Sequence, residues 1–249
     1  MYYNQLGDDY FVLKDDINVQ ILLGKIYFTY GFTENGYVVN FPIETIWWGY
    51  LMGIIEEFSS LMNHIYNKRG AIDAKKDIAY GKLGEVVAYA FLRDYQNFPS
   101  YCTPDFSVLP VSKKSWKPDL DAREFGSHFS VHVKSTDEQS YRRDGVASST
   151  WVFNIADKPG ARTGRDRIFD GPGDDFVVFV YVPGVASKRG YIKSVVRWDI
   201  VYKDKKNTML VDPFKKSFVG MKLTIWHKQI VDQWKISKNG IWLPEAFLC

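Results

Sequence analysis

The chain is poor in cysteine: among its 249 residues it has only Cys102 and Cys249. Two cysteines cannot build the disulfide framework that stabilises small secreted domains, so that class of protein is excluded. The N-terminal stretch MYYNQLGDDY is acidic and lacks the basic and apolar regions of a signal peptide. We therefore expect a cytoplasmic protein.

Long apolar runs are absent as well. The longest, IWWGYLMGII from Ile46 to Ile55, has ten residues and is followed by Glu56 and Glu57. A helix needs about 20 apolar residues to cross a bilayer. We therefore expect no membrane partner.

Two common catalytic motifs are also missing. The stretch GKLGE lacks the spacing of a phosphate-binding loop and its lysine followed by Ser or Thr. The G-x-S-x-G pattern of a nucleophile elbow does not occur. Nucleotide hydrolysis by a P-loop and Ser-His-Asp catalysis are therefore not expected.

The composition is that of a folded globular protein, with 46% hydrophobic and 24% charged residues. The net charge of +3 is unevenly distributed. Residues 1–60 hold eight acidic against two basic residues, whereas residues 185–228 hold eleven Lys or Arg against three Asp. Such a basic segment suits a polyanion, although a solvated lysine face is the alternative.

Two helices are expected in the first half of the chain. The first spans residues 40–70, with Asn40 as a cap, Pro42 in the first turn and Gly70 beyond the end. The second spans residues 73–95 and is apolar on nearly every side, so it should be buried.

Strand-like segments follow Pro99. They are YCTPDFSVLPV, a hairpin around FGSH, TWVFNIA, DDFVVFVYV and YIKSVVRWDIVY. The continuously apolar FVVFVYV indicates a central strand covered on both faces. Helices followed by a mixed sheet predict an α/β or α+β fold.

We expect a single domain over residues 1–249, because no repeat or low-complexity linker divides the chain. Its predicted parts are a helical N-terminal elaboration over 1–72, a core over 73–182 and a basic C-terminal extension over 183–249.

The hairpin gathers titratable side chains on one face. If Gly126 and Ser127 are its two central residues, as a type II′ turn allows, Asp121 opposes His132. Asp119 then opposes Lys134, about 4.5–5.5 Å away between Cβ atoms. A solvated ion pair worth at most about 1 kcal/mol is the alternative to a functional site.

A further carboxylate belongs to the second helix. Glu85 follows Gly81 and Gly84, which would let this helix approach another backbone closely. A buried carboxylate is costly unless it meets a cation or a metal. The alternative is a helix that frays at Gly84 and leaves Glu85 at the solvent edge.

A helix glutamate, a Pro-Asp at the start of a strand and an x-Lys on the next strand resemble the PD-(D/E)XK nuclease superfamily. The residues that carry this resemblance are Glu85 in GKLGEVV, Asp119 in KPDLD and Lys134 in VHVKST. It covers roughly residues 80–182 and implies a restriction-endonuclease-like mixed central sheet flanked by helices.

The resemblance also implies Mg²⁺-dependent hydrolysis of DNA phosphodiester bonds. Asp119 and Glu85 would ligate the metal, joined by the carbonyl of Val133. Lys134 would orient the attacking water and stabilise the developing charge. This agrees with the preference of Mg²⁺ for a few carboxylates plus substrate phosphate.

His132 departs from the pattern, since the family usually has an acidic residue or Gln two positions before the lysine. It is open whether His132 is a metal ligand, a general base or the mark of a decayed site. Imidazole suits Mn²⁺ better than Mg²⁺, and Asp121 could supply the missing carboxylate. Pro104-Asp105 repeats the Pro-Asp dipeptide, but no x-Lys strand follows it at hairpin distance.

Arginines in two segments are candidates for phosphate contacts, because phosphate neutralisation dominates nucleic-acid affinity. They are Arg142, Arg143, Arg162, Arg165 and Arg167. Their alternative role is to solubilise loops.

Two functions remain open. One is a metal-dependent DNA endonuclease of restriction, phage or repair type, and the other is a non-cleaving nucleic-acid-binding module on the same fold. The oligomeric state is also open, although a homodimer would suit symmetric cutting of both strands.

Overall fold

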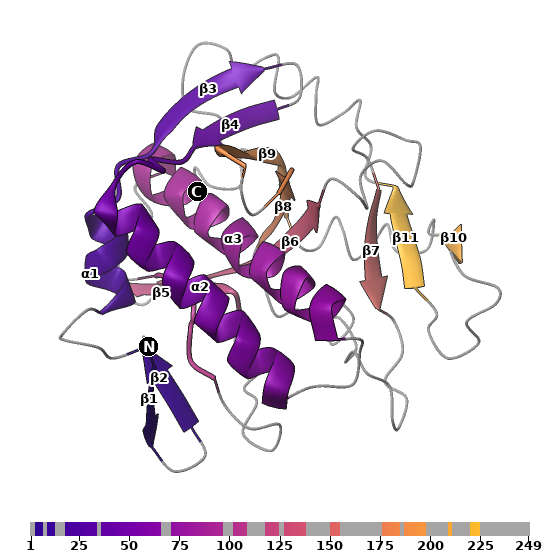
Figure 1. The fold of residues 1–249 in the computed structure, drawn as a ribbon. Helices are drawn as coiled ribbons and strands as arrows, with labels where there is room; N and C mark the ends of the chain where they lie inside the picture. Colours follow the sequence, from indigo (N-terminus) through magenta and orange to yellow (C-terminus); the bar gives the residue numbers. More distant parts are fainter. Residues whose placement is uncertain are drawn as a thin grey trace.

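The structure, a computed structural model, describes thirteen segments of the chain (Figure 1). They are residues 3–6, 9–12, 18–33, 36–65, 71–96, 102–108, 118–124, 127–137, 150–154, 176–184, 187–197, 209–210 and 220–224.

A six-stranded sheet forms the centre of the molecule, in the order β3-β4-β9-β8-β6-β5. Its β6 and β8 are parallel, and the other neighbours are antiparallel, so the sheet is mixed. The strands are β3 (Thr29–Thr33), β4 (Gly36–Asn40), β5 (Leu120–Glu124), β6 (Ser127–Asp137), β8 (Phe176–Val182) and β9 (Arg189–Arg197).

Three helices accompany the sheet: α1 (Val19–Gly24), α2 (Ile46–Ile65) and α3 (Ala71–Gln96). The long α3 packs on β6, β8 and β9, and α2 packs on α3 from outside (Figure 1). Because α3 lies between the sheet and α2, its residues from Leu83 to Leu92 are all buried. The predicted second helix is confirmed, and its burial is confirmed over residues 83–92.

The apolar run FVVFVYV forms β8, between β9 and β6. Its residues 177–182 are buried. Such a strand needs no polar alternation, because both faces are covered. The prediction of a central strand is confirmed, and the chain has a mixed α/β architecture.

The N-terminal part was expected to be helical, but it also contains strands. β1 (Tyr3–Leu6) and β2 (Asp9–Val12) form a hairpin, and β3 and β4 join the central sheet. Thr33 pairs with Gly36, which leaves Glu34 and Asn35 between the two strands. Asn35-Gly36, between segments rich in β-branched and aromatic residues, is a hairpin signal that the prediction missed, although Gly36 itself is already paired in β4.

The start of α2 also differs from the prediction. Asn40 does not cap it, because this residue is still paired in the sheet with Thr29 and Arg189. The side chain of Thr45 instead accepts a hydrogen bond of 3.2 Å from the backbone N–H of Trp48, as a capping residue does. Gly70, the expected end signal, lies outside the described residues.

The segment expected to be a basic extension contributes to the centre of the fold, since β9 lies between β4 and β8. Farther on, β10 (Met209–Leu210) and β11 (Gly220–Thr224) form a second sheet with β7 (Thr150–Asn154). The segment 102–108, expected as a strand, is irregular except for a bridge at Val108.

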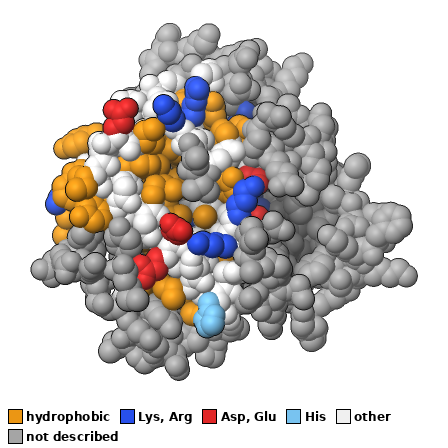
Figure 2. Space-filling view, viewed as in Figure 1, with side chains coloured by type: hydrophobic (Ala, Val, Ile, Leu, Met, Phe, Trp, Pro, Cys, Tyr) orange, Lys and Arg blue, Asp and Glu red, His pale blue; other side chains and the backbone are white. Residues whose placement is uncertain are grey.

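Exposed apolar side chains gather near α1 and the start of α2 (Figure 2). They are Ile21, Tyr27, Ile43 and Ile46. Among the described helices, none combines the length and apolar character required to span a bilayer.

Candidate active site

The hairpin of β5 and β6 has a different register from the predicted one. Leu120 pairs with Val131 and Glu124 with Ser127, so Phe125 and Gly126 lie between the strands. The shift is by two residues, which preserves the alternation of faces but changes every partner. A glycine suits the first position of a type II′ turn and the second of a type I′ turn, so it could not decide the register.

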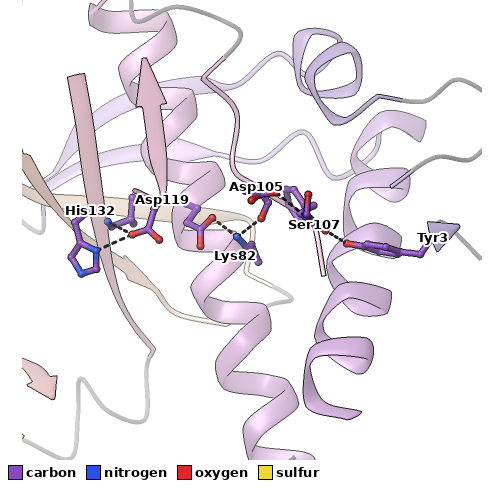
Figure 3. A network of polar contacts seen from close by, with 9 residues as sticks. Tyr3, Lys82, Asp105, Ser107, Asp119 and His132 are labelled. Carbon is purple, nitrogen blue, oxygen red and sulfur yellow. Dashed lines mark hydrogen bonds and ion pairs between the residues drawn. The ribbon is translucent and has the colours of Figure 1, made fainter. Parts of the chain in front are cut away.

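Asp119, just before β5, therefore meets His132 rather than Lys134 (Figure 3). Its Oδ2 lies 3.1 Å from His132 Nδ1 and accepts a hydrogen bond of 2.7 Å from the backbone N–H of Val133. The Nε2 atom of His132 is buried. In this geometry, His132 contacts Asp119 through Nδ1.

Glu85 is buried on α3, with 9% of its surface exposed. The burial of Glu85 follows from the close approach of α3 to β6. At the neighbouring Gly84, an added Cβ would lie only 2.6 Å from Ser135 Cβ. Gly81 shows no such proximity, since a Cβ there would meet nothing within 4 Å. The expected role of glycine in a close approach is therefore confirmed at Gly84 and wrong at Gly81. The helix does not fray there.

Glu85 has a cationic neighbour that the prediction missed. Lys82 Nζ lies 2.6 Å from Glu85 Oε2 and donates a hydrogen bond of 2.7 Å to the backbone carbonyl of Asp105. Spacing of three residues on one helix face was the available sign of the Lys82–Glu85 contact. Nothing in the sequence indicated that Asp105 would reach Lys82, because that contact is long-range.

The segment around Asp105 is itself anchored at two points. The Asp105 side chain accepts a hydrogen bond of 2.8 Å from the backbone N–H of Ser107. The Tyr3 hydroxyl, from the N-terminal hairpin, donates to the carbonyl of Phe106 at 3.0 Å. Two sets of polar contacts thus lie side by side, one joining His132 to Asp119 and the other extending from Lys82 through the segment of Asp105 to Tyr3 (Figure 3).

Burial and neighbouring charges perturb both carboxyl groups. Burial raises the pKa of Glu85 to about 8, with a further increase from Asp119 and an opposing effect of Lys82. Burial would also raise the pKa of Asp119, but the charge and hydrogen bond of His132, the Val133 N–H and Lys82 together lower it. These mutual effects place Glu85, Asp119 and Lys82 in one electrostatic cluster.

The remaining predicted residues are less closely tied to this cluster. Lys134 follows His132 by two positions on β6 and is half-buried. Asp121 pairs in the sheet with Ser130, so it does not oppose His132, and the expected compensation by Asp121 loses its geometric basis. The five candidate arginines lie outside the described residues.

Under the resemblance to the nuclease superfamily, Glu85, Asp119 and Val133 are the residues that would hold a divalent ion. Glu85 and Asp119 offer carboxylate oxygens, and Val133 offers a backbone carbonyl. Mg²⁺ is often held by only one or two carboxylates plus substrate phosphates. Within the part of the chain that the structure describes, no group of three or more His, Cys, Asp or Glu side chains could hold a metal.

A groove of about 870 Å³ lies elsewhere, between α2 and the first half of α3. Gly49, Met52, Lys75 and Ala79 are among the residues that line it. None of the predicted site residues lines this groove, so it does not extend the cluster around Glu85.

Comparison of the chain with protein-family models, with curated proteins and with solved structures finds no match in any of the three.

Proposed function

We propose that the protein is a metal-dependent deoxyribonuclease that hydrolyses DNA phosphodiester bonds, acts as an endonuclease and has a restriction-endonuclease-like core. One observation carries the proposal: α3 packs closely on β6 at Gly84 and Ser135, beside the buried Glu85, and Asp119, just before β5, contacts His132 of the same β6. The charge of Asp119 also contributes to the raised pKa of Glu85. Two acidic side chains from different elements, Glu85 buried and Asp119 28% exposed, make this region a candidate functional site.

Each residue has a distinct part in the proposed reaction. Glu85, Asp119 and the Val133 carbonyl would hold a divalent ion, which would supply polarisation of the phosphoryl oxygen and a more acidic bound water. His132, 3.1 Å from Asp119, fixes the orientation of that side chain. Lys134 stabilises the negative charge that develops on the phosphate oxygens.

Plasmid nicking in the presence of Mg²⁺ or Mn²⁺ tests the proposal. We expect the wild type to nick supercoiled DNA and Lys134→Ala to be slower by about 10²-fold or more, the usual effect of losing one charge-stabilising group. Equal nicking by both proteins would attribute the activity to a contaminating nuclease and remove the proposal.

The contact between His132 and Asp119 favours a second candidate, a non-cleaving nucleic-acid-binding module. An imidazole at 3.1 Å from Asp119 Oδ2 stands where the family pattern has a further acid. This candidate predicts DNA binding without nicking in either metal. In both cases the DNA affinity should fall steeply with salt, because phosphate contacts release counterions.

Two further parts of the proposal concern the setting of the protein. Symmetric cutting of both DNA strands would involve a homodimer, and the scarcity of cysteine suits the cytoplasm. Analytical ultracentrifugation with and without duplex DNA measures the first of these directly.

A further inference from the structure

The strand β3 lies at one edge of the central sheet, and its sequence is nearly the same when it is read from either end. The segment TYGFT has a threonine at each end, an aromatic residue next to each threonine, and Gly31 at the centre. β3 pairs with β4 on one side, and among the described strands none pairs with its other side. An edge strand presents N–H and C=O groups on its outer side, where another strand can bind.

β3 lacks the features that usually keep an edge strand from pairing with another chain. Such features are charged side chains, proline and bulges, and the segment TYGFT contains neither a charged residue nor a proline. Its register with β4 is regular over all five residues, so no bulge bends it. Both terminal threonines, Thr29 and Thr33, are exposed. The edge is therefore suited to accept an added strand.

The centre of this edge is open on the face of the sheet that lies away from α3. The Tyr30 hydroxyl donates a hydrogen bond of 3.0 Å to the carbonyl of Ala90 in α3, so Tyr30 faces that helix. Side chains alternate along a strand, so position 31 faces the opposite way. A Cβ added to Gly31 would meet nothing within 4 Å. A larger side chain can therefore be placed there without a clash inside one chain.

We propose that two copies of the chain associate through β3, with the two strands antiparallel about a twofold axis beside Gly31. In this register Gly31 opposes the partner's Gly31, Thr29 opposes the partner's Thr33, and Tyr30 opposes the partner's Phe32. Threonine pairs and aromatic pairs across two strands are favourable. A twofold interface brings the same segment of both copies together, and a strand that is symmetric in residue type matches itself in that arrangement.

The association should be reversible. A five-residue strand pair is smaller than a stable interface, which buries about 800 Å² on each partner. The dimer should therefore dissociate on dilution. The inference does not depend on nuclease activity, although a dimer of this kind would suit an enzyme that cuts both DNA strands.

Sedimentation equilibrium of the full chain over a concentration series tests the inference. We expect the wild type to dimerise at or below about 100 µM. In Gly31→Lys the new lysine would oppose its own copy, with Cβ atoms about 4.5–5.5 Å apart. Repulsion between these like charges should weaken dimerisation about tenfold or more. Gly31→Glu should do the same for the same reason.

A mixture of Gly31→Lys and Gly31→Glu provides the decisive comparison. Lysine then opposes glutamate, so the mixture should form a heterodimer at least as readily as the wild type dimerises. This rescue requires position 31 to oppose itself, which occurs only if the twofold axis passes beside it. Gly24→Lys is the matched control, because Gly24 is exposed, has open space at an added Cβ and lies outside β3. It should keep the wild-type dissociation constant.

Three results would overturn the inference. One is a wild type that remains monomeric up to about 100 µM, which would leave the β3 edge to some other occupant. Another is dimerisation of Gly31→Lys with wild-type affinity, which would place the interface elsewhere. The third is a mixture that dimerises no better than either variant alone.

If the charged variants do not fold, disulfide formation by Gly31→Cys provides a second measurement. Opposed Cα atoms of an antiparallel pair lie about 4.5–5.5 Å apart, within the range of about 4.4–6.8 Å that a disulfide spans. Oxidised Gly31→Cys should therefore form a covalent dimer, whereas Gly24→Cys should form no more than the wild type does. Equal cross-linking of the two variants would overturn the inference.

Discussion

Replacement of Gly84 by alanine should disturb both the stability and the site, because this position sets the distance between α3 and β6. The new Cβ would lie 2.6 Å from Ser135 Cβ, about 1 Å closer than the optimum of roughly 3.5–4.0 Å for carbon atoms. Neither atom is the end of a flexible side chain, so α3 and β6 must separate. Overpacking of this kind costs about 1–3 kcal/mol.

Gly81→Ala provides the matched control. It lies on the same helix three positions earlier, and its added Cβ would meet nothing within 4 Å. Both substitutions gain about 0.5–1 kcal/mol because alanine is the better helix former. The difference between the two variants therefore isolates the overpacking, and it should be about 1–3 kcal/mol in the free energy of unfolding.

Urea unfolding at equilibrium measures both variants, with the midpoint and slope compared to those of the wild type. Removing the Ser135 side chain should relieve the clash, so Gly84→Ala combined with Ser135→Gly should show a coupling of about 1 kcal/mol or more. Gly84→Ala should also slow nicking about 10²-fold, since a shift of about 1 Å displaces Glu85 from Asp119. Equal stability of Gly84→Ala and Gly81→Ala would refute the close approach of helix and strand.

Three further predictions concern titration. The pKa of Glu85 is raised to about 8, so the contribution of its protonated form to the free energy of unfolding is complete below pH 4.5 and is lost as the pH rises to about 8. In metal-free urea unfolding, Glu85→Gln should flatten this decline in stability. Because burial raises the pKa of Glu85, metal binding to its ionised form should release protons near neutral pH, seen as a calorimetric enthalpy that varies with the buffer; no variation would contradict this prediction. Burial lowers the pKa of Lys193 to about 8. The free energy of unfolding of the wild type should therefore rise by a few kcal/mol from pH 8 to 10.5. An equal rise in Lys193→Met would exclude Lys193 as the source of this pH dependence.

Much of the fold followed from local patterns in the sequence. The segment around Glu85 is apolar on nearly every side, and such a helix is stable only when covered, here by the sheet and α2. The run FVVFVYV has no polar face and therefore lies inside the sheet as β8. The N-terminal strands β3 and β4 were missed although Asn35-Gly36 signals a hairpin, because a turn signal does not reveal which sheet its strands join.

The sequence predicted several residues of the site but not the contacts between them. Strand alternation placed Asp119, His132 and Lys134 on one face of the hairpin, and a register shift of two residues keeps that face. The same shift changed the partner of Asp119 from Lys134 to His132. Lys82 and Asp105 were absent from the predicted site.

The sequence by itself determined which segments must be buried and which side chains share a strand face, because both depend on periodicity along one element. Only the tertiary structure decided that His132 meets Asp119 and that Lys82 joins Glu85 to Asp105. These contacts depend on the register of a hairpin whose glycine suits two turns, and on the packing of segments distant in the chain. Local periodicity contains no information about either.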